Sequence, residues 1–193
     1  MDMNRMKETL LLHSCCGPCS TAVIERLAEE GYQLTVLFAN ANITEEEEYR
    51  KRLSEQKRFL SEYNKNQTPD QQVAFLEGSY QPDQYLRRFE GLEAEPEGGA
   101  RCEVCFSLRL AETAETCKKL GLSSFATTLS VSPHKNVQKI NRIGMELASQ
   151  IGVEFLPFDF KKKNGYQRSL ELSREHALYR QNYCGCEFSR RGD

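Results

Sequence analysis

The sequence lacks any apolar run long enough to cross a membrane as a helix, which needs about 20 consecutive apolar residues. The longest apolar stretch, residues 36–39 with their flanks, has the length of a β-strand. Residues 1–7 have no long apolar segment and no small-residue cleavage site, so we expect no secretory signal peptide. These absences predict a cytoplasmic protein that neither is secreted nor associates with a membrane.

The sequence also lacks a dominant sign of charge. Its 26 Lys and Arg residues stand against 28 Asp and Glu residues, a net charge of −2, which argues against a dedicated nucleic-acid coat protein. The balance changes along the chain, however. Residues 1–130 carry 15 basic and 21 acidic groups (−6), whereas residues 131–193 carry 11 and 7 (+4). The basic C-terminal third is therefore compatible with a local phosphate-binding face.

The remaining composition is that of an ordinary globular chain. It has 193 residues, 39% of them hydrophobic and 28% charged, and its mean hydropathy is −0.63. This length is enough to bury a core without disulfides or metals as structural supports. We expect one α/β domain over residues 1–193, in which residues from about 160 onward form a C-terminal extension that packs over a metal site.

Short apolar segments alternate with amphipathic ones, which predicts β-α-β units and a mostly parallel, doubly wound sheet of five strands. Thr44 and Glu47 have the spacing of a helix N-cap and its capping box. Ligands of such sheets lie beyond the carboxyl ends of the strands. The predicted strands are residues 9–13, 33–39, 73–76, 125–129 and 153–156; the predicted helices are residues 18–30, 44–63, 82–89, 102–120 and 136–150, with a further helix from about 169.

Eight cysteines stand out in this background, and seven of them are clustered: Cys15, Cys16 and Cys19; Cys102 and Cys105; Cys184 and Cys186. Tight clusters are typical of ligand sets, because several sulfurs must converge on one point, whereas disulfides stabilise most by closing long loops. Cys117 is separate. It lies twelve residues beyond Cys105 on a predicted helix, about 18 Å along the axis, so we expect it in the core.

Two cysteines from each of the first two clusters make a set of four: Cys15, Cys16, Cys102 and Cys105. A tetrahedral zinc ion and a [4Fe–4S] cluster both use four such ligands. Adjacent cysteines suit the cluster better, because their side chains diverge and its irons are spread over several ångströms. The remaining three, Cys19, Cys184 and Cys186, are candidates for a second, open site: an additional mononuclear iron or a redox pair.

Two other classes of protein fit part of this pattern. A thiol–disulfide oxidoreductase would use Cys16-Gly17-Pro18-Cys19 as its redox pair but would leave five other clustered cysteines without a role. A zinc-stabilised RNA-binding module would use one closed four-cysteine site, and the seven clustered cysteines exceed it.

Four motifs in order give the sequence a closer resemblance: LLHSCCGPC at 11–19, RCEVCFSLRL at 101–110, TTLSVSPHKN at 127–136 and YRQNYCGC at 179–186. Over residues 9–189 the sequence resembles the epoxyqueuosine reductase QueH family. It departs from that family's pattern at residues 40–43, Asn-Ala-Asn-Ile, where an aromatic-Asn-Pro-Asn turn is expected.

The resemblance implies a fold similar to the adenine-nucleotide alpha-hydrolases and the last step of queuosine biosynthesis. In that step epoxyqueuosine, at the wobble position of tRNA, is reduced to queuosine without cobalamin. The resemblance also favours a [4Fe–4S] cluster over zinc. The reaction implies an external electron donor, ferredoxin- or flavodoxin-like. We hypothesise that the second iron binds the epoxide oxygen as a Lewis acid, with Cys19 in a catalytic position.

Loss of the epoxide oxygen also needs protons. His134 is the candidate donor, and its alternative role is to hold its loop by hydrogen bonds. Residues expected to bind substrate or tRNA share positive charge, a position before a predicted helix, or an aromatic surface. They are Ser132, Lys135, Lys161, Lys162, Lys163, Arg168, Tyr179 and Arg180.

Overall fold

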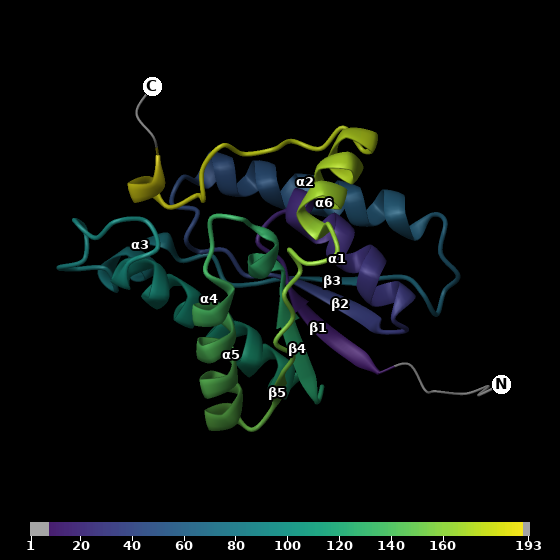
Figure 1. The fold of residues 1–193 in the computed structure, drawn as a ribbon, viewed down its shortest axis with the longest axis horizontal. Helices are drawn as coiled ribbons and strands as arrows, with labels where there is room; N and C mark the ends of the chain where they lie inside the picture. The colour runs from purple at the N-terminus through teal and green to yellow at the C-terminus, as the bar shows by residue number, and fades with distance from the viewer. Residues whose placement is uncertain (1–7, 191–193) are drawn as a thin grey trace.

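A computed structural model describes residues 8–190. Five parallel strands form one sheet in the order β3-β2-β1-β4-β5 (Figure 1). This confirms the predicted five-stranded, doubly wound α/β fold. The strands are β1 (Thr9–His13), β2 (Gln33–Phe38), β3 (Ala74–Glu77), β4 (Ser124–Thr127) and β5 (Glu154–Phe155).

Helices cover both faces of this sheet. Helices α1, α2 and α6 pack together on one face, and α4 packs against α5 on the other (Figure 1). Their bounds are α1 (Gly17–Glu29), α2 (Glu46–Asn64), α3 (Pro82–Arg87), α4 (Ala100–Lys119), α5 (Val137–Ile151) and α6 (Gly165–Glu175); two 3-10 turns, η1 (Thr128–Val131) and η2 (Glu187–Ser189), complete the elements.

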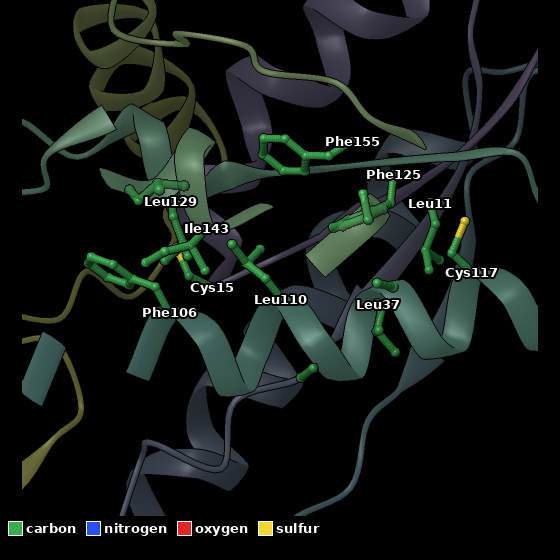
Figure 2. Packing of buried hydrophobic residues seen from close by; sticks show 14 of the residues in the cluster. Leu11, Cys15, Leu37, Phe106, Leu110, Cys117, Phe125, Leu129, Ile143 and Phe155 are labelled. Carbon is green, nitrogen blue, oxygen red and sulfur yellow. The ribbon is translucent and has the colours of Figure 1, made fainter. Parts of the chain in front are cut away.

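The apolar run of β1 explains why the sheet is covered on both sides. Leu10, Leu11 and Leu12 are all fully buried, and successive side chains of a strand point to opposite faces. Leu10 and Leu12 therefore enter the core beneath α1 and α2, whereas Leu11 enters the core beneath α4 and α5. Figure 2 shows Leu11 in this second core, with Phe125 of β4 and Leu110 of α4.

Several element boundaries differ from the sequence prediction by one to four residues, and contacts in the structure explain two of these differences. The capping box at Thr44 and Glu47 is wrong: α2 begins at Glu46 with Glu45 as its N-cap. The backbone N–H of Thr44, which Glu47 would have satisfied, instead donates to the carbonyl of Gly185 at 3.3 Å. The predicted fourth strand is also too long, because the chain turns into η1 after Thr127, whose hydroxyl accepts the N–H of Leu129 at 3.1 Å.

Strands are added toward one edge of the sheet from β1 to β3 and toward the other edge from β4 to β5, so the strand order reverses between the parallel neighbours β1 and β4. Such a switch point leaves a crevice beyond the carboxyl ends of the two strands. The turn from β1 into the first turn of α1 carries the first cysteine cluster, and the loop after β4 and η1 carries residues 132–135. Within residues 8–190, no helix has the length and apolar character needed to span a bilayer.

After α6 the chain runs along α2 with little regular structure (Figure 1). Arg58 of α2 donates to the carbonyls of His176 and Ala177, and Glu55 accepts the N–H of Tyr179 at 2.7 Å. These bonds come from side chains of α2, so they hold the irregular segment along this helix. The segment ends beside the loops that follow β1 and β2, bringing Cys184 and Cys186 to the same edge of the sheet.

Candidate metal centre

The first cysteine cluster lies where β1 passes into α1. Cys16 is the extended N-cap residue of α1, and Pro18 occupies its first turn, where a missing N–H costs nothing. This tight entry brings the three sulfurs of Cys15, Cys16 and Cys19 within 4.8 Å of one another, close enough for one metal ion to hold all three. The position at a helix N-terminus also favours thiolate over thiol.

Within this group the thiols interact strongly. The sulfurs of Cys15 and Cys16 are 3.9 Å apart. Hydrogen bonds from Cys16 and Cys19 hold the pKa of Cys15 well below its usual value. Because Cys16 donates its proton to Cys15 in this hydrogen bond, the pKa of Cys16 is raised to about 12.

The other two clusters meet each other. Cys102 and Cys105, one turn apart in α4, line a small, mostly apolar cavity of about 40 Å³ together with Cys184 and Cys186. The sulfur of Cys102 accepts the N–H of Gly98 at 3.2 Å. Cys105 is buried, and burial raises the pKa of its thiol. The four cysteines thus come from α4 and from the C-terminal segment.

Cys184 connects the two groups. It lines the small cavity and also a larger one, of about 230 Å³, that Cys15 and Cys19 line. All seven clustered cysteines therefore converge at one edge of the sheet. The sequence assigned Cys19 to a site with Cys184 and Cys186, whereas the structure places its sulfur beside Cys15 and Cys16. The division of the ligands between two centres stays a prediction.

Cationic side chains accompany the thiols. Arg109 of α4 is buried, and its Nη2 donates to Oδ1 of Asn40 at 2.5 Å. Burial alone would lower the pKa of Arg109, but the negative charge of Cys105 and Cys15 raises it. Burial likewise opposes charge on Lys135, whereas charge on Cys184, Cys15 and Cys19 raises its pKa. These two cations offset charge that several thiolates in one place would otherwise leave uncompensated.

Two histidines lie near the cysteines in different environments. His13 is fully buried, with Nδ1 2.8 Å from the Thr127 hydroxyl and Nε2 3.2 Å from the carbonyl of Ala39. Burial, reinforced by Arg109, lowers the pKa of His13 to about 3, so it is a neutral structural residue. His134 is exposed and lines both cavities, and its backbone N–H donates to the Ser132 hydroxyl at 3.3 Å.

The residues expected to bind substrate or tRNA separate into two groups. Ser132, Lys135 and Arg180 line the larger cavity, with the tyrosines at 166 and 183. Lys161 lies beside them, since its Nζ donates to the carbonyl of Lys135 at 2.6 Å.

The second group lies elsewhere. Lys162, Lys163 and Arg168 line a separate depression near α1, where Arg168 makes two hydrogen bonds to Glu25, at 2.7 and 2.9 Å. Tyr179 packs against α2. Its hydroxyl lies 3.1 Å from a carboxylate oxygen of Glu48, and the ammonium group of Lys51 lies over its ring.

Sequence reasoning missed several residues that shape the site. Thr128 contacts Cys15, and Asn40 joins Arg109 to the carbonyl of Ser14. Gln181 lines the larger cavity and donates a hydrogen bond to Cys16. Thr128, Arg109 and Gln181 lie within the motifs quoted above, but their contacts depend on pairings across the sheet that the motifs do not show. Cys117 is fully buried at the far end of α4, as expected of a core residue (Figure 2). Its sulfur donates to the carbonyl of Leu122.

Comparison with known proteins identifies the family. The family model for epoxyqueuosine reductase QueH matches residues 10–192. The chain belongs to this family. It is 45% identical to an epoxyqueuosine reductase QueH of Streptococcus pyogenes serotype M1 over 95% of this chain and 71% of the relative. It is 34% identical to that of Thermotoga maritima, covering 94% of this chain and 90% of the relative.

Family membership confirms the sequence-based assignment to an oxidoreductase of queuosine biosynthesis. A third relative, the QueH of Staphylococcus epidermidis, is 40% identical over 93% of this chain and 75% of its own length. Among solved structures, the Bordetella bronchiseptica enzyme WbmH in complex with NAD+ is similar at 14% identity and a TM-score of 0.35, over 77% of this chain and 54% of that chain. That likeness is too weak to add to the family assignment.

Proposed function

We propose that this protein reduces epoxyqueuosine, in the wobble position of tRNA, to queuosine in the cytoplasm, using iron centres held by its seven clustered cysteines. The observation that carries the proposal is the convergence of three cysteine clusters on one sheet edge, in a chain that belongs to the QueH family. A two-site thiolate set of this size exceeds what one structural zinc ion needs.

The donor set fits an iron–sulfur centre. It is all sulfur, two of its sulfurs accept hydrogen bonds from Thr128 and Gly98, and Arg109 and Lys135 supply compensating charge. We propose that residues from about 160 onward pack over this centre as the extension that delivers two of its ligands, Cys184 and Cys186. When bound, the centre would supply electrons one at a time and a Lewis-acidic iron for the epoxide oxygen.

Two divisions of the ligands are open to test. The first gives a [4Fe–4S] cluster to Cys15, Cys16, Cys102 and Cys105, and a second iron to Cys19, Cys184 and Cys186. The second keeps Cys15, Cys16 and Cys19 together, as their 4.8 Å grouping favours, and gives the cluster to the four cysteines around the small cavity. Replacing Cys19 and Cys184 by serine separately and counting iron distinguishes them. In the first division each substitution removes about one iron, whereas in the second Cys184→Ser removes about four.

The residues around the larger cavity have separate proposed roles. Removing the epoxide oxygen as water and leaving an alkene takes up two electrons and two protons, so a proton donor is required. His134 is the proposed donor because it is exposed and lines both cavities. Lys135, Arg180 and Ser132 are proposed to bind phosphate, and Tyr166 to stack on an unpaired base. A ferredoxin- or flavodoxin-like protein is the proposed electron donor.

A direct assay tests this function. The iron-loaded protein is incubated anaerobically with epoxyqueuosine-containing tRNA and dithionite, and the tRNA nucleosides are then identified by mass spectrometry. We expect epoxyqueuosine to be converted to queuosine. Conversion should be lost in Cys105→Ala but kept in Cys117→Ala, because Cys117 lies in the core. Unchanged epoxyqueuosine with fully iron-loaded protein would overturn the proposal.

A further inference from the structure

A buried ion pair on α2 faces the C-terminal segment that carries Cys184 and Cys186. The Arg52 side chain is only 2% exposed, and its Nε donates to Oε1 of Glu48 at 2.6 Å. Burying such a pair has a large desolvation cost, and apolar residues of the same volume often stabilise a fold as well. The pair therefore calls for an explanation other than general stability.

The two remaining nitrogens of the Arg52 guanidinium both bond the C-terminal segment. Nη1 donates to the carbonyl of Cys184 at 3.2 Å and Nη2 to the carbonyl of Tyr183 at 3.3 Å. The same guanidinium lies 5.0 Å from the centre of the Tyr183 ring. These residues belong to neither a helix nor a strand, so no regular backbone hydrogen bonding satisfies their carbonyls. Arg52 satisfies both of them with one rigid, planar group.

Neighbouring contacts complete a cradle for the segment. The amide of Asn42 also donates to the carbonyl of Cys184, at 3.3 Å, and the N–H of Thr44 donates to the carbonyl of Gly185. Gly185 has a φ of +104°, and a Cβ there would lie 2.7 Å from Ile43 and 3.2 Å from Nη1 of Arg52. The segment therefore lies directly on the guanidinium, with no room for a side chain between them.

We propose that Arg52, oriented by Glu48, is a positioning residue that docks the Tyr183–Cys186 segment and so sets Cys184 between the two groups of cysteines. The position of the Cys184 carbonyl fixes the start of its side chain, and that residue lines both cavities. Glu48 strengthens the arrangement because it also accepts the hydroxyl of Tyr179, from the same C-terminal segment, at 3.1 Å. The inference rests on the proposed function only for its consequence, the completion of the iron site.

The chain offers a matched control. Arg50 and Glu46 form an ion pair with the same i,i+4 spacing on the same helix, but their side chains are 75% and 63% exposed. Arg52→Gln and Glu48→Gln are therefore compared with Arg50→Gln, all in the full-length chain. Arg52→Lys keeps the charge and most of the volume but loses the planar fork, and it serves if Arg52→Gln does not fold.

The first measurement uses metal-free, reduced protein. Each cysteine is labelled with a maleimide over time, and the labelled positions are quantified by mass spectrometry. We expect Cys184 and Cys186 to react about tenfold faster in Arg52→Gln, since the lost hydrogen bonds came from a charged donor. Cys117, which lies in the core away from the segment, should keep its rate, and Arg50→Gln should match the unmodified chain. Equal acceleration at every cysteine, or none at Cys184 and Cys186, would overturn the proposal.

The second measurement is iron bound after anaerobic reconstitution with ferrous iron and sulfide. We expect Arg52→Gln to retain half of the iron or less, with a changed electron paramagnetic resonance spectrum, and Arg50→Gln to retain all of it. If Arg52→Gln kept the normal level of iron, the positioning role of Arg52 would be contradicted, but the proposed function of the protein would not. If the unmodified chain bound no iron, the proposed function would fail, whereas the labelling pattern would still decide whether Arg52 docks the segment.

Discussion

The hydroxyl of Thr128 joins Cys15 to the end of the neighbouring strand. It accepts the backbone N–H of Cys15 at 3.1 Å and donates to the sulfur of Cys15 at 3.4 Å. One side chain thus satisfies a buried backbone donor and bonds a sulfur of the first cysteine cluster. The two residues are 113 positions apart in sequence and meet because β1 and β4 are paired.

This contact predicts the effect of removing the hydroxyl. Thr128→Val keeps the shape of the side chain but leaves the N–H of Cys15 buried without an acceptor, which should lower the free energy of unfolding by about 1–3 kcal/mol. Thr128→Ser retains the hydroxyl and should cost less. Urea denaturation of the metal-free proteins measures both, and a valine variant as stable as the serine variant would show that the hydroxyl is dispensable.

Asn40 should matter more for stability than an exposed amide. Its Nδ2 donates to the carbonyl of Ser14 at 2.8 Å, and its Oδ1 accepts from the buried Arg109 at 2.5 Å. Asn40→Ala removes a charged hydrogen bond in the interior, so we expect a loss of about 2–3 kcal/mol in the free energy of unfolding. Gln33→Ala, which removes an exposed amide bonded to the carbonyl of Gln72, is the control and should cost under about 0.5 kcal/mol. Similar losses in both would contradict the account.

The strands could be predicted because their apolar runs are local signals. Leu10, Leu11 and Leu12 are buried on both faces of the sheet, and a continuous apolar run is typical of such a strand. The start of α2 could not be predicted in the same way. Thr44 has the right residue type for an N-cap, but its N–H is taken by Gly185, 141 residues later (185 − 44), so a distant contact overrides the local pattern.

The same limit applies to the site. Spacing alone identified the seven clustered cysteines and separated Cys117 from them, because ligand clusters are local in sequence. Which clusters face each other depends on where the irregular C-terminal segment docks, and that depends on Arg52 of α2. The same holds for one of the basic residues. The sequence predicts Arg168 as a phosphate ligand, but in the structure its guanidinium makes two hydrogen bonds to Glu25.

Arg168 and Arg180 should therefore differ in their contribution to tRNA binding. Arg180 lines the larger cavity and donates to the neutral hydroxyl of Ser173, whereas the charge of Arg168 is paired with Glu25. We expect Arg180→Gln to weaken tRNA binding about tenfold and to reduce the slope of log K against log salt by about 1. Arg168→Gln should change both much less. Binding titrations between 50 and 200 mM salt measure the two slopes; equal slopes would refute the distinction.

Cys117 provides a test of which thiols bind iron. It is fully buried at the far end of α4, and its sulfur donates to the carbonyl of Leu122 at 3.3 Å. Cys117→Ala should cost about 1 kcal/mol of folding free energy and leave the bound iron unchanged. Cys105→Ala on the same helix should lose iron. Loss of iron in Cys117→Ala, without unfolding, would show that the ligand set has been drawn wrongly.

The most direct measurement is the iron, acid-labile sulfide and zinc content of the protein purified without oxygen, together with its electron paramagnetic resonance spectrum after reduction. We expect about four irons with matching sulfide in a cluster, about one further iron, and little zinc. A colourless protein with one zinc ion and no sulfide, or a reversible disulfide between Cys16 and Cys19 with no iron, would contradict this expectation.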